Sequence, residues 1–92
     1  MPHADQSLVV LTSELVRAAR ALLRWEQRDL EHASSVSLPT IKRLESTPGV
    51  MRAHRSTLTA LKSALEVAGV EFIDENGGGP GVRLRKRQTK KN

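Results

Sequence analysis

The 92-residue sequence contains no cysteine and no tyrosine, and only one tryptophan and one phenylalanine. Without cysteine, neither a disulfide framework nor a thiolate metal site can form, so a hydrophobic core has to stabilise the fold. Two aromatic residues are too few for the stacking platform of single-strand nucleic-acid binders, and we expect Trp25 to pack in the core. The length allows one domain with a modest core.

The sequence also lacks a long apolar run and a basic N-terminal leader. No stretch approaches the roughly 18–20 apolar residues that are needed to cross a bilayer. Residues 1–6 carry no positively charged segment of the kind that opens a secretory signal. We therefore expect a soluble, cytoplasmic protein that makes no membrane contact.

Signals of catalysis and of metal binding are missing as well. The histidines His3, His32 and His54 are scattered, and none has a second histidine at i+3 or i+4. The glycine-rich stretch 76–81 follows no long strand and precedes no helix, so it predicts a turn and not a phosphate-binding loop. We expect no enzyme activity, no catalytic residue, no metal and no cofactor.

Positive charge is concentrated at the C-terminal end of the chain. The formal net charge is +5, but six basic residues and no acidic one follow Val82, so residues 1–82 carry nine basic and ten acidic residues, a net of −1. A basic tail attracts any polyanion. DNA, RNA and a membrane surface are all polyanions, so the tail by itself specifies no partner, and a solvated terminus is the alternative.

Helical periodicity predicts a first helix that begins after residue 12. Thr12 can cap it, and Glu14 in its first turn faces the positive end of the helix dipole. Apolar residues recur at helical spacing on one face. They are Leu15, Ala19, Leu22 and Leu23.

A last helix is predicted to end before residue 70. Ser56 or Thr57 can cap its start, and Gly69 occupies the position after a helix that favours a left-handed residue. The apolar stripe consists of Leu58, Leu61, Leu65 and Ala68.

Two shorter helices are predicted between these, at 27–34 and at about 37–46. Glu26 can cap the first of the two and Ser37 the second. Ile41 and Leu44 point to one side of the second helix. The other side holds Pro39, Lys42, Arg43 and Ser46. One face would pack on the domain and the other would be free.

From residue 70 the pattern changes to the alternation of strands, at 70–73 and 82–85, which predicts a β-hairpin. A lone two-stranded ribbon is marginally stable in water, so the hairpin must fold back on the helices or pair with another copy. In the second case a dimer interface would be formed by Val70, Phe72, Val82 and Leu84. We divide the chain into an N-terminal arm (1–11), a helical domain (12–69), a hairpin (70–85) and a basic flexible tail (86–92).

Two short helices joined by a tight turn, the second with a polar outer face, are typical of a helix-turn-helix. Residues 27–44 resemble the helix-turn-helix of the lambda repressor and Cro superfamily, also called the Xre family. The residues that carry the resemblance are Gln27 at the start of the first helix, Leu30 and Ala33 on its inner face, Val36 in the turn, and Ile41 and Leu44 of the recognition helix. The resemblance covers residues from about 12 to 69 and implies a mainly α fold, a four- to five-helix lambda-repressor-like domain, here followed by the short C-terminal hairpin.

The resemblance also implies roles for single residues. Gln27 would touch the DNA backbone or a base. The first turn and the exposed face of the recognition helix would read base edges through Ser37, Leu38, Pro39, Thr40, Lys42 and Arg43. Arg20 and Glu45 would form a structural ion pair. We expect a protein of bacterial or phage origin that associates with the nucleoid.

Side-chain chemistry agrees with these roles. Arg43 has the fork geometry to bind guanine O6 and N7 together, and Leu38 could meet a thymine methyl group. Ser37 and Thr40 are equally well explained as helix caps. Phosphate contacts, which fix register and carry no sequence information, are expected from Lys42, Arg52 and Arg55.

Two positions depart from the pattern of the family. Glu31 stands where the family usually has alanine, because the two helices cross closely there. We expect its carboxylate to turn toward Arg28 or a residue of the tail. Ser35 stands where the turn usually has glycine, and it would cost about 1 kcal/mol if its φ is positive.

The resulting expectation is a transcriptional regulator that binds double-stranded DNA as a homodimer. Two alternatives remain open: a protein-interaction module of the same fold, such as an antitoxin or anti-activator with a protein partner, and an architectural or excisionase-like DNA-binding protein. Salt-dependent binding to a random duplex would separate them.

Overall fold

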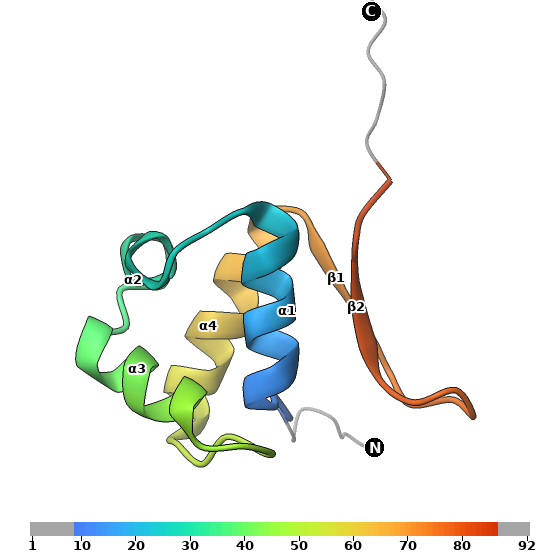
Figure 1. Ribbon diagram of the computed structural model, residues 1–92, viewed down its shortest axis with the longest axis horizontal. Coiled ribbons are helices and arrows are strands. Elements are labelled where there is room, and N and C mark those ends of the chain that lie inside the picture. The colour runs from blue at the N-terminus through green and yellow to red at the C-terminus, as the bar shows by residue number, and fades with distance from the viewer. Residues whose placement is uncertain (1–8, 87–92) are drawn as a thin grey trace, which may run out of the picture.

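The computed structural model describes residues 9–86, which form four helices followed by a two-stranded antiparallel hairpin. The elements are α1 (Ser13–Leu23), α2 (Gln27–Ser34), α3 (Leu38–Ser46), α4 (Arg55–Val67), β1 (Val70–Ile73) and β2 (Gly81–Leu84). The predicted mainly α fold with a C-terminal hairpin is therefore confirmed, with four helices. Figure 1 shows α2 and α3 at one end of the molecule and the hairpin at the other. In the described range, no helix has the length and apolar character to cross a membrane.

The first helix begins where it was predicted but buries a different face. The Leu15 N–H donates to Thr12 Oγ1 at 3.1 Å, which confirms the cap. Val16 and Ala19 are fully buried, whereas Leu22 is 40% exposed, so the predicted apolar stripe is only partly correct. Because α1 packs against α3 on one side and against the hairpin on another, the apolar pattern alone could not predict which residues lie in the middle of its buried face.

The turn between α2 and α3 contains a strained residue. Ser35 ends α2 with a φ of 63°, in the left-handed region, as expected for a position that the family fills with glycine. Val36 is half-buried against the core. Ala33, which we expected on the inner face of α2, is exposed.

The last helix starts earlier than predicted. His54, not Ser56 or Thr57, is the N-cap residue, and no side-chain hydrogen bond caps the helix. The first backbone bond of the helix runs from the Leu58 N–H to the His54 carbonyl, at 3.1 Å. The start is set by the packing of the leucines of α4 into the core, which a search for capping residues does not detect.

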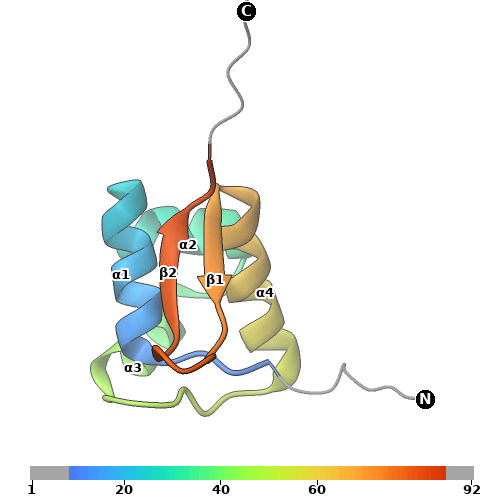
Figure 2. The same cartoon turned by 90° about the vertical axis from the view of Figure 1, so that its right-hand side faces the viewer.

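The hairpin folds back onto the helices, which is one of the two arrangements expected from the sequence. Its strands pair Val70 with Leu84 and Phe72 with Val82, which puts these four side chains on one face. This face covers α1 and α4 (Figure 2). Val70 is fully buried, so its side chain is not available for the predicted dimer interface. Phe72 and Val82 are half-buried against the core and Leu84 is 48% exposed, and for these three residues the interface stays a prediction.

The described residues directly before α1 pack into the core. Leu11, which we assigned to an arm over residues 1–11, is fully buried. The Met51 N–H donates to the Leu11 carbonyl at 2.8 Å, and the Ser13 N–H donates to the Gly49 carbonyl at 2.9 Å. These bonds tie the segment to the loop after α3. The rest of the expected arm, 1–8, and residues 87–92 of the expected tail lie outside the described residues.

Candidate nucleic-acid interface

One face of α3 is buried and the opposite face is exposed. Ile41, Leu44 and Glu45 are no more than 4% exposed. The exposed residues of the helix are Pro39, Lys42, Arg43 and Ser46. This division matches the predicted one, because residues three and four apart share a face of a helix. The exposed side chains are carried by a helix that is anchored along its whole inner side.

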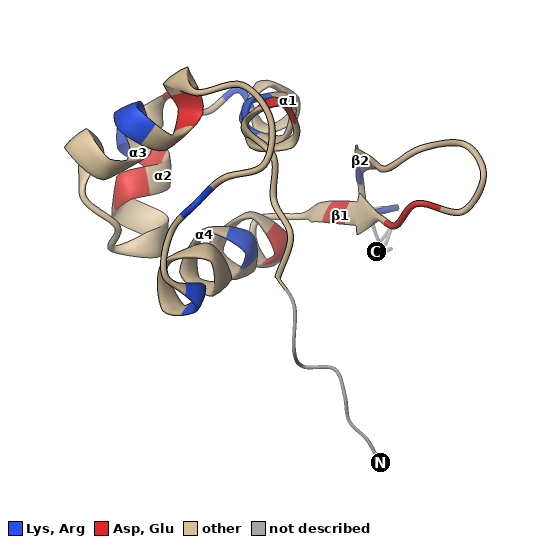
Figure 3. Cartoon of the chain, turned by 90° about the horizontal axis from the view of Figure 1, so that it is seen from below, with Lys and Arg blue, Asp and Glu red and all other residues tan. Residues whose placement is uncertain are grey.

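Cations surround this exposed face. Residues 37–55 hold four basic residues and one acidic residue. The acidic residue, Glu45, is buried and paired with Arg20, so it does not neutralise the exposed cations. Figure 3 shows basic segments on α3, in the following loop and on α4, all visible from the same side. The exposed cations of this stretch are Lys42, Arg43, Arg52 and Arg55.

Arg43 and Arg52 line a shared pocket. The other lining residues include the apolar Leu44, Val50 and Met51. Leu44 and Met51 are buried, whereas Val50 is 55% exposed. The pocket lining therefore combines apolar side chains with two arginines, a combination that suits the sugar and phosphate of a nucleic-acid backbone.

The inner side of α3 is tied to α1 and α2 by an ionic network. Arg20 Nε donates to Glu45 Oε2 at 2.8 Å, and Arg20 Nη2 donates to Glu45 Oε1 at 2.6 Å. The Gln27 side-chain amide donates to Glu45 Oε1 at 3.1 Å. The structure thus joins Arg20 and Glu45, the two residues expected to pair. It also places Gln27, expected on DNA, against that pair, and within residues 9–86 the second hydrogen of its amide group has no partner.

The first turn of α3 is held by polar side chains. The Ser37 hydroxyl accepts the Thr40 N–H at 3.4 Å and donates to Thr40 Oγ1 at 2.9 Å. The Leu38 N–H donates to Glu31 Oε2 at 3.0 Å. The expectation that Glu31 turns toward Arg28 or the tail is therefore wrong. The carboxylate bonds instead to a backbone N–H at the N-terminus of α3, because the helix leaves this group without an intrahelical partner and its dipole favours an anion there.

A second carboxylate holds the loop that carries Arg52. The Gly49 N–H donates to both oxygens of Glu14, at 3.2 and 3.3 Å. Hydrogen bonds from the backbone N–H groups of Glu14 itself and of Gly49 hold the pKa of this carboxyl below its ordinary value of 4.5. Gly49 has a φ of 92°, so the loop turns here through a conformation that favours glycine.

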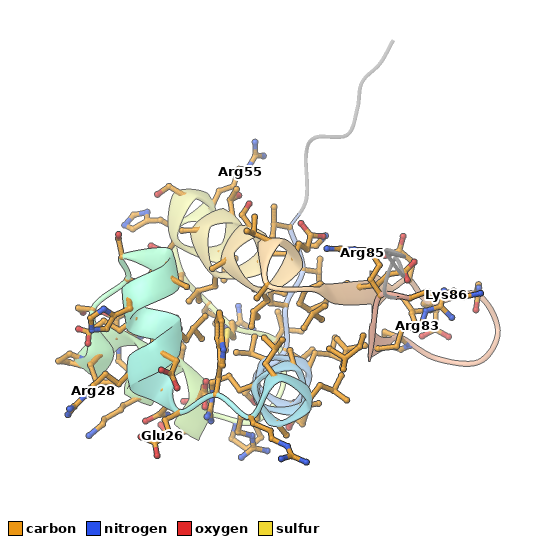
Figure 4. All side chains as sticks on the ribbon, turned by 90° about the horizontal axis from the view of Figure 1, so that it is seen from above. Glu26, Arg28, Arg55, Arg83, Arg85 and Lys86 are labelled. Carbon is orange, nitrogen blue, oxygen red and sulfur yellow. The ribbon has the colours of Figure 1, made fainter. Side chains whose placement is uncertain are left out.

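One cation near α3 was not selected from the sequence. Arg28, in the first turn of α2, lines a hollow together with Gln27, Leu38 and Lys42. Its side chain points away from the body of the domain (Figure 4). Its position directly after Gln27, the residue that opens α2, is the signal that could have identified it.

The basic residues of the hairpin lie away from α2 and α3 (Figure 4). Arg83 pairs with Glu71 at 3.0 Å, and this pairing lowers the pKa of the Glu71 carboxyl. Arg85 donates to the Glu66 carbonyl at 3.0 Å, near the C-terminal end of α4. The side chains of Arg83 and Arg85 are therefore engaged in contacts within the chain.

No protein-family model and no curated protein matches the chain in comparisons with known proteins. Among residues 9–86, no group of three or more histidine, aspartate or glutamate side chains is arranged to hold a metal ion. The function is therefore inferred from the exposed face of α3 and from the cations around it.

Proposed function

We propose that the protein is a sequence-specific regulator of transcription that binds double-stranded DNA by placing α3 in the major groove. The observation that carries the proposal is the division of α3 into a buried face and an exposed face, with Lys42 and Arg43 on the exposed side. The major groove, about 12 Å wide, admits an α-helix. The resemblance of residues 27–44 to a helix-turn-helix supports the same arrangement.

The exposed residues divide into base-reading and phosphate-binding groups. Arg43 is the main base-reading residue, since its guanidinium can donate to guanine O6 and N7 together. Pro39, Ser46 and the half-buried Leu38 offer surface for thymine methyl groups and base edges. Ser37 and Thr40 bond to each other and act mainly as caps. Phosphate contacts come from Lys42, Arg52, Arg55 and Arg28.

The regulator would act on a two-fold-related site as a homodimer, with half-sites about one helical turn apart. Val70 is buried in its own chain, so a second copy would have to use the strand edge, the exposed Leu84 or another surface. Sedimentation of the free protein and of its DNA complex would measure the number of copies.

Selection of bound duplexes from a random DNA pool tests the proposal. We expect a preferred sequence, and Arg43→Ala should weaken binding to it by about 1–3 kcal/mol, roughly 5- to 150-fold. Arg83→Ala is the matched control, because it removes the same charge from the hairpin and should leave the preference unchanged. Salt-dependent binding without any preferred sequence would instead indicate an architectural protein.

A protein-interaction module, such as an antitoxin or anti-activator, is the second candidate. It is favoured by an apolar hollow between α2 and α4, lined by Trp25, Ala60, Ala64 and Val67 among others. Val67 is 86% exposed, so this hollow presents apolar surface that a partner could cover. Absence of any salt-dependent binding to DNA would favour this second function.

A further inference from the structure

The Glu31 carboxylate, on α2, caps the first turn of α3. Glu31 Oε2 accepts the Leu38 N–H at 3.0 Å, and the bond spans the turn that joins the two helices. Both residues are half-buried. A hydrogen bond from a backbone N–H to a carboxylate is stronger than one between neutral groups, and the helix dipole favours a negative charge at this end.

The other N–H groups of the first turn are also satisfied within the protein. The Thr40 N–H donates to the Ser37 hydroxyl, and the Ile41 N–H donates to the Ser37 carbonyl at 3.0 Å. Pro39 has no N–H. A helix start usually leaves such groups free, which makes it a site for phosphate and other anions. From Leu38 to Ile41, α3 has no unbonded N–H to offer to DNA.

We infer that Glu31 is a positioning residue of the DNA-binding site. It holds the start of α3 against α2, and its negative charge keeps a DNA phosphate away from the helix N-terminus. The inference rests on the proposed function. Recognition then falls to side chains further along α3, above all Arg43. The phosphates are left to the cationic side chains around the helix.

Two substitutions separate the hydrogen bond from the charge. Glu31→Gln keeps an oxygen that accepts the Leu38 N–H but removes the negative charge near the phosphates. We expect it to bind preferred and random duplexes alike about two- to fivefold more tightly. Glu31→Ala removes the acceptor as well. We expect it to lower the ratio of affinities for preferred and random duplexes about tenfold, because α3 loses its tie to α2.

Glu75→Ala is the matched control, since it removes an exposed carboxylate from the hairpin turn. It should change neither the affinities nor their ratio. Unfolding in urea, followed by the fluorescence of Trp25, shows which variants are folded under the binding conditions. If Glu31→Ala does not fold, Glu31→Gln still decides the phosphate role: affinity that fails to rise for both duplexes would overturn it.

Hydrogen exchange of the Leu38 amide tests the tie without DNA. We expect slow exchange in the wild-type protein and in Glu31→Gln, and faster exchange in Glu31→Ala. Equal exchange in the wild-type protein and Glu31→Ala would overturn the inference, as would an unchanged affinity ratio in Glu31→Ala. If the wild-type protein prefers no sequence, the proposed function fails and the DNA-positioning role fails with it, even where the Leu38 amide behaves as expected.

Discussion

Arg20 and Glu45 lie 25 residues apart in the sequence and meet through two parallel hydrogen bonds, at 2.8 and 2.6 Å. Arg20 comes from α1 and Glu45 from the buried side of α3. The side chain of Glu45 is only 3% exposed and that of Arg20 is 17% exposed. The pair therefore fixes the helix that we propose to read DNA against the helix that forms its support.

Removing Arg20 should destabilise the protein strongly. In Arg20→Ala the buried Glu45 carboxylate keeps a single hydrogen bond from the residues that the structure describes, that of the Gln27 amide at 3.1 Å. We expect the free energy of unfolding to fall by about 3–5 kcal/mol, as measured by urea unfolding with Trp25 fluorescence. The free energy of unfolding of Arg20→Lys should lie between those of the wild-type protein and Arg20→Ala, because one ammonium group cannot form both parallel hydrogen bonds of the guanidinium. The exposed pair Arg83 and Glu71 is the control: Arg83→Ala should cost less than about 1 kcal/mol.

Replacing Ser35 by glycine should stabilise the protein. Ser35 has a φ of 63°, and a residue with a Cβ is strained in that region by about 1–2 kcal/mol. Part of the gain is lost because glycine has more freedom in the unfolded chain, so Ser35→Gly should raise the free energy of unfolding by about 0.5–1 kcal/mol. Ser46→Gly, within α3, should have the opposite effect. A loss of stability in Ser35→Gly would contradict the assigned backbone strain.

The bond between Glu14 and Gly49 should make stability depend on pH. The pKa of Glu14 is lowered in the folded protein by hydrogen bonds from its own backbone N–H and from that of Gly49. The stabilisation is therefore present above the ordinary value of 4.5 and is lost as the pH falls through the lower folded value. Urea midpoints measured from about pH 7 to about pH 3 should fall less steeply for Glu14→Gln than for the wild-type protein. Parallel curves would show that the bond does not contribute.

The cations beside α3 should act on DNA binding in a different way from Arg43. If Arg52 and Arg55 bind phosphates, Arg52→Gln and Arg55→Gln should each weaken binding to all duplexes alike. Each should also reduce the slope of log K against log salt by about 0.9. Fluorescence anisotropy over a salt series measures both effects. A changed sequence preference in either variant would assign that residue to base reading instead.

Leu11 should contribute as much to stability as a residue within a helix. It is fully buried, and its carbonyl accepts the Met51 N–H. Leu11→Ala should lower the free energy of unfolding by about 2–5 kcal/mol, because the cavity adds to the lost burial. Val10→Ala is the matched control, since Val10 is 58% exposed. A loss of less than about 1 kcal/mol in the free energy of unfolding of Leu11→Ala would contradict a core role and support the original assignment of this residue to the N-terminal arm.

Local chemistry made some elements predictable. Thr12 caps α1, the break at Ser35 ends α2, and Ser37 caps α3, each through interactions that reach at most four residues along the chain. The exposed face of α3 could also be predicted, because the 3.6-residue repeat of a helix places Ile41 and Leu44 on one face and Lys42 and Arg43 on another.

Long-range packing determined what the sequence analysis missed. The start of α4 depends on leucines that meet the core, and the buried face of α1 depends on where the hairpin docks. Leu11 is buried where Met51, 40 residues later in the sequence, pairs with it. None of these contacts leaves a periodic signal, since the partner is distant in the sequence.

The amino-acid sequence by itself determined the number and order of the elements, the turn between α2 and α3, and the outward direction of Arg43, because these follow from hydrogen bonds and periodicity within a few residues. Only the tertiary structure decided that the hairpin covers its own core and that Glu31 bonds to the start of α3. Both outcomes depend on which surfaces and polar groups are brought together in space, and a carboxylate goes to whichever hydrogen-bond donor the packed chain places beside it.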